Sequence, residues 1–225
     1  MIDIVKLSKS FGTRTLWSDV TATVSRGEML ALVGPSGSGK STLLNCLGLL
    51  DKPTSGAIRH DGKDITRFGG RETRLYRRDV LGYLFQNYAL IEESTVAANL
   101  EIAIRPQRTT RGDTRAVIAD ALDRVGLAGR EAERIHHLSG GEQQRVALAR
   151  LIVKQPALVL ADEPTGALDR AHTTAVMDIL REMSEGGCAV VIATHDEYVR
   201  DRCDAVLTVG EDAALTATST TRIPS

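Results

Sequence analysis

A glycine-rich segment near the N-terminus has the residue types that bind a phosphate chain. Residues 34–41 read Gly-Pro-Ser-Gly-Ser-Gly-Lys-Ser and match the pattern G-x-x-x-x-G-K-[ST] at every fixed position. Glycines let backbone N–H groups point at phosphate oxygens, and the N-terminus of a following helix adds a favourable dipole. We expect Lys40 to reach the β- and γ-phosphates and the Ser41 hydroxyl to ligate Mg²⁺. The predicted nucleotide contacts of this segment are Gly34, Pro35, Ser36, Gly37, Ser38, Gly39, Lys40, Ser41 and Thr42.

Two adjacent carboxylates follow an apolar run in the last third of the chain. Residues 158–161 read Leu-Val-Leu-Ala and predict a buried strand, and Asp162 and Glu163 come directly after it. Asp162 would hold Mg²⁺, usually through water, and Glu163 could polarise an attacking water as a general base. Two acids that merely end a strand before Pro164 would explain the pair equally well if it stood alone.

A second glycine pair precedes a predicted long helix. Residues 138–143 read Leu-Ser-Gly-Gly-Glu-Gln, in which a serine hydroxyl, glycine amides and a helix N-terminus could again bind an anion, although a plain helix cap would also fit. With this segment the sequence resembles the ATP-binding-cassette (ABC) ATPases, whose signature motif reads LSGGQ. In that family the signature completes the ATP site of a partner subunit, so the resemblance implies a head-to-tail dimer that is expected to be a homodimer. The residues implied to act on the partner's ATP are Ser139, Gly140, Gly141 and Glu142.

Other ABC elements follow in the family's order. Gln86 matches the Q-loop glutamine that senses Mg²⁺, and Asp169 matches the D-loop that crosses the dimer interface. His195 matches the switch histidine at the γ-phosphate, and Phe11 stands where a tyrosine usually stacks on adenine. The resemblance covers roughly residues 1–210 and implies ATP and Mg²⁺ as cofactors. It implies catalytic roles for Lys40, Glu163 and His195, and metal contacts from Ser41, Gln86 and Asp162.

Composition narrows the class of protein further. The chain has 225 residues, 42% of them hydrophobic, and a formal net charge of −1, so it can bury a core and lacks the broad positive field of a nucleic-acid binder. The segment 67–78 holds five arginines and is interpreted as a solvated loop or helix face. Cys46, Cys188 and Cys203 read as reduced thiols. The N-terminus does not resemble a secretory signal, and no apolar run approaches the length of a membrane span.

The pattern of apolar residues predicts a single α/β domain with a mixed or parallel sheet core, a small antiparallel β layer and a helical lobe. Fully apolar runs such as 189–193 favour a parallel sheet that is covered on both faces. Apolar residues at helical spacing predict helices within 95–104, 115–125, 142–153 and 173–183. Asp61-Gly62 predicts a hairpin turn in the antiparallel layer. We expect the core, with the β layer, to comprise residues 1–86 and 139–210, the helical lobe 87–138, and a polar tail 211–225.

Within the ABC family, the segment 83–104 and the short chain are most similar to the macrolide-exporter and lipoprotein-releasing group, and to small ATPases of haem and bacteriocin exporters. This resemblance implies a cytoplasmic ATPase on the inner face of the cell membrane that drives a separate integral-membrane permease. The exported substrate would be hydrophobic or amphipathic, such as haem, a peptide, a drug or a lipoprotein. The alternative is the ATPase of a mechanotransmission complex of the cell-division type, which moves no substrate. Nucleic acid is not an expected partner.

Overall fold

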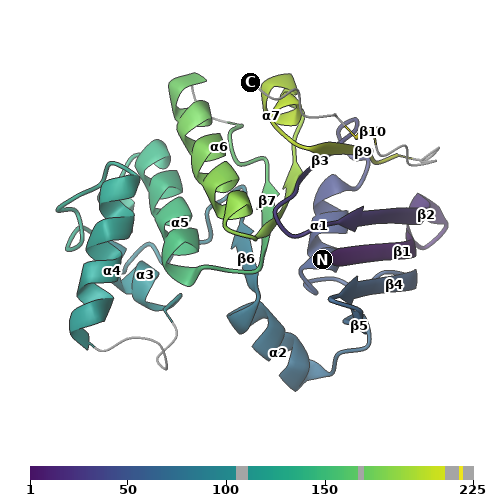
Figure 1. Ribbon diagram of the computed structural model, residues 1–225, viewed down its shortest axis with the longest axis horizontal. Coiled ribbons are helices and arrows are strands. Elements are labelled where there is room, and N and C mark those ends of the chain that lie inside the picture. Colours follow the sequence, from purple (N-terminus) through teal and green to yellow (C-terminus); the bar gives the residue numbers. More distant parts are fainter. Residues whose placement is uncertain (105–110, 167–169, 211–217, 220–225) are drawn as a thin grey trace.

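The computed structural model describes residues 1–104, 111–166, 170–210 and 218–219. Asp169 and most of the predicted polar tail lie outside the described residues. Helices and strands alternate along the chain (Figure 1). In chain order they are β1 (Ile2–Phe11), β2 (Arg14–Val24), β3 (Met29–Val33), α1 (Lys40–Leu47), β4 (Ser55–His60), β5 (Lys63–Asp64), α2 (Gly70–Asp79), β6 (Leu81–Leu84), α3 (Val96–Glu101), α4 (Arg111–Arg124), the 3-10 turn η1 (Ile135–His137), α5 (Gly140–Lys154), β7 (Leu158–Asp162), α6 (Arg170–Glu185), β8 (Ala189–Ala193), α7 (Glu197–Asp201), β9 (Ala205–Thr208) and β10 (Thr218–Ser219).

The central sheet has the strand order β10-β9-β3-β8-β7-β6, with parallel pairing throughout except at β10. Side chains that alternate along each strand enter two separate hydrophobic clusters, one on each face. On β8, Val190 and Ile192 join the cluster beneath α5 and α6, while Val191 joins the cluster that includes α1. Both faces are therefore buried, which explains why these strands read as continuous apolar runs. This confirms the predicted α/β architecture.

The smaller sheet is antiparallel, with the order β2-β1-β4-β5. β4 and β5 are joined by Asp61 and Gly62, both in the left-handed region at φ 48° and 79°. Two consecutive positive φ values match the right-handed twist of a hairpin, so the predicted Asp-Gly turn is confirmed. The sheet packs Ile4, Trp17 and Ile58 into the same cluster as α1, and Figure 1 shows it beside that helix. It thereby holds the N-terminal end of α1 in place.

Helices α3, α4, α5 and α6 bury one shared cluster at the other end of the molecule (Figure 1). The predicted helices within 95–104, 115–125, 142–153 and 173–183 are all present, and α4, α5 and α6 are longer than the apolar pattern indicated. Ser139 caps α5 by accepting a hydrogen bond from the Glu142 N–H at 3.4 Å, and the Glu142 carboxylate accepts one from the Ser139 N–H at 2.8 Å. This reciprocal cap fixes where α5 begins.

Several elements were not predicted. They are α2, β6, α7, β9 and β10. Helix α2 buries a single side chain, Tyr76, so it lacks the apolar stripe from which a helix is recognised. In the part of the chain that the structure describes, no helix has the length and apolar character needed to cross a bilayer.

All three cysteines are free thiols in the core. Burial raises the pKa of Cys46, Cys188 and Cys203 to about 12. Cys46 lies near the C-terminal end of α1, the helix that follows the glycine-rich segment.

Candidate active site

The glycine-rich segment forms the loop between β3 and α1. Gly34, Gly37 and Gly39 have φ values of 148°, 78° and 92°, which other residues adopt only with strain. Gly39 precedes the first residue of α1, and a Cβ placed on it would lie 2.7 Å from the Trp17 indole nitrogen. The loop therefore packs closely against a buried tryptophan of the antiparallel sheet. Gly39 is required both for its positive φ and because a Cβ would clash with Trp17.

A cavity of about 610 Å³ opens above this loop. Its lining includes predicted site residues that are far apart in the sequence. The Lys40 ammonium at its floor donates hydrogen bonds to the carbonyls of Gly34 and Pro35 at 2.8 and 3.2 Å. The predicted residues that line the cavity are Ser36, Gly37, Gly39, Lys40, Ser41, Thr42, Gln86, Glu163 and His195. Pro35 and Ser38 line a smaller neighbouring cavity of about 290 Å³.

Asp162 ends β7 beside the first turn of α1. The Ser41 hydroxyl donates a hydrogen bond to the Asp162 carboxylate at 3.0 Å. Burial raises the pKa of Asp162, the Ser41 hydrogen bond opposes that rise, and the neighbouring Glu163 charge adds to it. Among the described residues, Asp162 is not part of the cavity lining, but its carboxylate contacts Ser41, which lines the cavity together with Gln86. The three side chains offer oxygen donors of the kind that Mg²⁺ prefers.

Glu163 is placed by the parallel pairing of β7 with β8. Its backbone N–H donates to the Ala193 carbonyl at 3.0 Å, and its φ of 48° turns the chain out of the sheet just before Pro164. The Glu163 carboxylate lies 2.9 Å from Nδ1 of His195, which follows β8. The Glu163 side chain is 19% exposed and that of His195 is 72% exposed, so the pair stands at the rim of the cavity. A half-buried carboxylate held by an imidazole can accept a proton from a bound water.

Four residues that were not predicted also line the cavity. They are Leu16, Tyr88, Gln144 and Gly166. Gln144 is buried in α5, and its amide donates a hydrogen bond to the Pro164 carbonyl. Helix α5 therefore contacts the residue that follows Glu163. The sequence carried only a weak signal for Gln144, namely a polar residue on the otherwise apolar buried face of a helix.

The signature residues lie elsewhere. Among the described residues, the lining of the 610 Å³ cavity does not include Ser139, Gly140, Gly141 or Glu142. The Glu142 carboxylate instead accepts from the Ser139 hydroxyl at 2.7 Å and pairs with Arg130 at 3.1 Å. The Ser139 hydrogen bonds, followed by Arg130, lower the pKa of Glu142. The structure therefore does not bring the signature to the phosphate-binding loop of the same chain.

Phe11 is also outside the cavity lining of the described residues. It ends β1, the residue is 55% exposed, and the Lys9 ammonium lies 4.6 Å from the ring centroid. Lys9 is itself held by the Asp51 carboxylate at 2.7 Å. Lys9 thus contacts the Phe11 ring, while more than half of the surface of Phe11 remains accessible.

A separate groove of about 270 Å³ lies between the sheet and the helices. Its lining includes Tyr83 and Phe85, whose rings stack with centroids 3.9 Å apart, directly before Gln86. The Tyr83 hydroxyl also donates to the side-chain oxygen of Asn45 on α1 at 3.0 Å. These contacts connect the groove with the helix that begins at Lys40.

A family model described as "ABC transporter" matches residues 17–166, more than half of the chain. The fold agrees, because the chain superposes on the ATP-binding cassette MJ0796, solved as a dimer with ADP and Pi, with a TM-score of 0.89. That likeness has 31% sequence identity and covers 99% of this chain and 100% of MJ0796. The chain belongs to the ABC transporter family and has the fold of its ATP-binding cassette.

The chain is also similar to the ATP-binding part of longer curated proteins. The chain is 40% identical over 214 residues to "Macrolide export ATP-binding/permease protein MacB 1/2" of Paracoccus denitrificans, covering 95% of this chain and 32% of that protein. It is 38% identical over 224 residues to "Pyoverdine export ATP-binding/permease protein PvdT" of Pseudomonas syringae pv. tomato, covering 97% and 34%. The chain therefore spans about a third of the length of these relatives.

We predict that Gly39→Ala destabilises the protein more than Gly37→Ala does. Both positions have a positive φ, so both substitutions strain the backbone. Only at Gly39 would the new methyl group meet a neighbour, the Trp17 indole, whereas nothing lies within 4 Å of a Cβ at Gly37. Overpacking of this kind costs about 1–3 kcal/mol, so the two free energies of unfolding in urea should differ by that amount. Equal losses would show that Trp17 does not constrain the loop.

Proposed function

We propose that this chain is the ATP-hydrolysing cassette of a membrane exporter, and that it works as a dimer on the cytoplasmic face of the cell membrane. ATP binding would close the dimer and hydrolysis would reopen it, with the lobe 87–138 passing the movement to an integral-membrane permease. The observation that carries the proposal is the Glu163–His195 contact at 2.9 Å on the cavity that Lys40 and Ser41 also line.

The residues of this cavity suit hydrolysis of a nucleoside triphosphate. Lys40 and the first N–H groups of α1 would bind the β- and γ-phosphates, and Glu163 would accept the proton of the attacking water. His195 would hold the Glu163 carboxylate in place and contact the γ-phosphate. Phe11, with Lys9 behind its ring, would stack on the adenine from outside the phosphate cavity.

Mg²⁺ fits the donor set of this site. Ser41, Asp162 and Gln86 offer a hydroxyl, a carboxylate and an amide oxygen, all of them oxygen donors. When bound, the metal would neutralise charge on the β- and γ-phosphates. The Ser41 hydrogen bond and the more distant Lys40 charge both favour the ionised Asp162 carboxylate.

Dimerisation would complete the site. The Ser139–Glu142 turn at the N-terminus of α5 is suited to bind an anion, yet it does not line its own chain's cavity among the described residues. A head-to-tail dimer would bring the turn of each protomer to the γ-phosphate bound by its partner. The dimer of the cassette MJ0796 supports this arrangement. Asp169 is proposed to lie at the same interface.

The 270 Å³ groove is the proposed docking site of the permease. Leu50 and Ile102 on its rim are 43% and 67% exposed, although both are large apolar side chains. Exposed apolar residues gathered around a groove favour a protein partner. The Tyr83–Asn45 hydrogen bond and the Tyr83–Phe85 stack would connect an occupant of the groove to α1 and Gln86.

The names of the relatives support export rather than mechanotransmission. Those relatives export macrolides or pyoverdine, and each carries a permease in the same protein. We propose that the substrate of this system is likewise hydrophobic or amphipathic, such as a drug, haem, a peptide or a lipoprotein. Each of these substrates would pass through the permease without contacting the ATPase, so all four are compatible with the cavity described above.

Glu163→Gln is expected to lower the ATP turnover number at least about 100-fold, because a general base contributes 10²–10⁴-fold. ATP binding should persist, since the amide keeps the size of the side chain, and the variant should accumulate as a closed dimer with ATP. Turnover and light scattering after size-exclusion chromatography measure the two effects. Lys40→Ala is the control and should lose both ATP binding and dimerisation. A Glu163→Gln protein that hydrolyses ATP at the wild-type rate would refute the general-base role.

Asp162→Asn is expected to stabilise the metal-free, nucleotide-free protein at pH 7 while impairing hydrolysis. The raised pKa of Asp162 means that its ionised form is disfavoured in the folded state, so this carboxyl's contribution to stability is lost as the pH rises through that pKa. Asparagine keeps an acceptor for Ser41 without the charge. Its advantage in thermal unfolding should therefore shrink as the pH falls toward about 3.9. Mg²⁺-dependent turnover should fall at least about tenfold. A variant that is less stable than wild type at pH 7 would contradict this account.

The export proposal is tested by recovering the partner. Affinity-tagged Glu163→Gln protein would be expressed in the source cell and purified from solubilised membranes with ATP and Mg²⁺. We expect a permease with few spans and a large extracytoplasmic domain. Ile102→Asp combined with Glu163→Gln should lose that permease while retaining ATP binding, because a charge would enter the apolar rim of the groove. Recovery of cell-wall hydrolase regulators would favour mechanotransmission instead, and recovery of only soluble proteins would refute the membrane role.

A further inference from the structure

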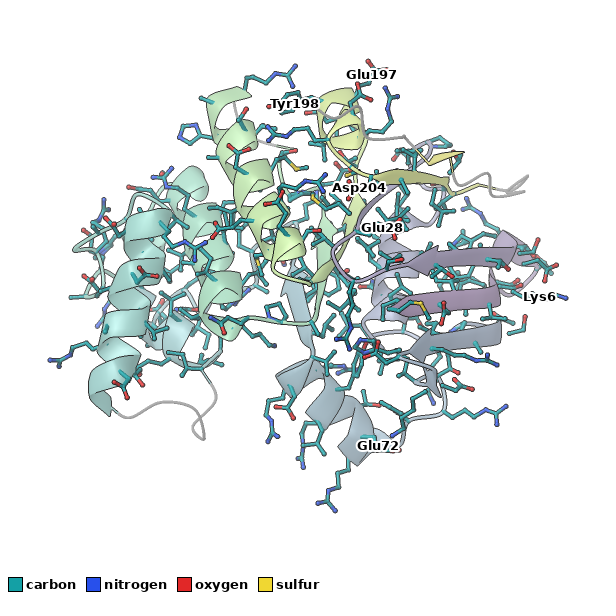
Figure 2. All side chains as sticks on the ribbon, viewed as in Figure 1. Lys6, Glu28, Glu72, Glu197, Tyr198 and Asp204 are labelled. Atoms are coloured by element: carbon teal, nitrogen blue, oxygen red, sulfur yellow. The ribbon has the colours of Figure 1, made fainter. Side chains whose placement is uncertain are left out.

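Helix α2 presents a stripe of arginines to the solvent. Arg71, Arg74 and Arg78 are exposed and follow one another at spacings of three and four residues, which places them on one face of the helix. Arg67, just before the helix, continues the stripe, and its side chain is 87% exposed. Figure 2 shows nitrogen-tipped side chains extending from this helix into open space around the labelled Glu72.

The opposite face of α2 holds the stripe in a fixed orientation. Tyr76 is buried and packs edge-on against His60 and Phe68, with ring centroids 5.5 and 6.0 Å apart. Arg77, next to Tyr76, donates a hydrogen bond to the Leu49 carbonyl. The helix is thereby anchored through Tyr76 and Arg77, and the arginine stripe cannot turn inward.

Charge is not balanced along this stripe. Residues 63–79 contain six Lys or Arg and three Asp or Glu, a net charge of +3 in a chain whose total is −1. The acids are already engaged, because Asp64 pairs with Arg67, Glu72 with Lys63 and Asp79 with Arg78. Within the described residues, no carboxylate lies at ion-pair distance from Arg71 or Arg74. Two guanidinium groups are left to bind an anion from outside.

The position of the stripe indicates which anion this is. Helix α2 adjoins the 270 Å³ groove, which Arg77 and Lys154 line, and the Lys154 ammonium donates to the Arg77 carbonyl at 2.9 Å. In Figure 1, α2 extends below both sheets. The same groove is also lined by the exposed Ile102, which directly follows α3. An occupant that is embedded in a bilayer would bring this side of the cassette close to lipid headgroups.

We propose that the stripe formed by Arg67, Arg71, Arg74 and Arg78 binds the anionic phospholipid surface beside the docked permease. This proposal rests on the proposed function only for the direction in which the groove faces. Guanidinium groups suit the purpose because they form paired hydrogen bonds with phosphate oxygens and are weakly hydrated. The interaction orients the cassette against the membrane and is weakened by salt.

The test measures binding of the whole chain to lipid vesicles at low ionic strength. Vesicles of phosphatidylcholine alone are compared with vesicles in which about a third of the lipid is phosphatidylglycerol. We expect binding to the second set only. The double variant Arg71→Gln/Arg74→Gln should bind about 30-fold more weakly, as follows from about 1 kcal/mol for each charge near an anionic surface.

The matched control is Lys6→Gln/Arg200→Gln. Lys6 is exposed on β1 at the outer end of the antiparallel sheet, and Arg200, with a side chain 39% exposed, lies on α7 at the opposite end of the molecule from α2 (Figures 1 and 2). The control removes the same number of positive charges, so it should bind the anionic vesicles like wild type. Equal losses in the two double variants, or equal binding to neutral and anionic vesicles, would overturn the proposal. Absence of vesicle binding by the wild type would do the same.

Two further measurements separate the alternatives. A single-stranded RNA oligomer that binds through Arg71 and Arg74 while the vesicles do not would assign the stripe to nucleic acid and overturn the lipid proposal. ATP turnover of the Arg71→Gln/Arg74→Gln variant should equal that of wild type, because neither residue lines the phosphate cavity. If the wild-type protein hydrolyses ATP but does not bind the anionic vesicles, only the lipid proposal is refuted. If it binds the vesicles but does not hydrolyse ATP, only the proposed ATPase function is refuted.

Discussion

The pairing of β7 with β8 is the constraint on which the candidate site depends. It places Asp162 and Glu163 at the end of one strand and His195 just beyond the end of its neighbour. Because carboxyl ends of parallel strands share one edge of the sheet, residues 32 positions apart come within hydrogen-bond distance. The left-handed turn at Glu163 is tolerated because its N–H is bonded to Ala193 on one side and Gln144 binds the Pro164 carbonyl on the other.

The position of α5 beside this edge of the sheet also explains why the turn formed by Ser139–Glu142 lies apart from the glycine-rich loop of the same chain. Helix α5 begins at Ser139 and runs into the core through Gln144, so its N-terminus is held at a distance from the loop that its interior helps to support. Two parts of this helix therefore differ in their surroundings. Its buried face supports the Glu163 turn of its own chain through Gln144, whereas its capped end at Ser139 lies outside the cavity lining of the described residues.

Sequence patterns predicted the elements whose burial is regular. The run 189–193 became β8 with the same bounds, and Asp61-Gly62 became the turn, because strand alternation and positive φ are local properties. They did not predict α2, which buries only Tyr76, or the contact of Gln144 with Pro164, which joins residues 20 positions apart. Nine of the residues that were predicted from motifs line one cavity. The position of Phe11 could not be predicted from the motifs, because it depends on the register of β1 with β2 and on the contact with Lys9.

The deep burial of the three cysteines has a consequence for redox chemistry. With pKa values of about 12, only on the order of one thiol in 100,000 is ionised at neutral pH, and the thiolate is the form that reacts with peroxide or disulfides. Cys46 sits on the phosphate-binding helix, where an adduct would disrupt α1, yet the folded protein shields it from oxidants and alkylating reagents. The three thiols should therefore react slowly with oxidants for as long as the protein stays folded. A single surface cysteine could carry a fluorescent label without removal of the native thiols.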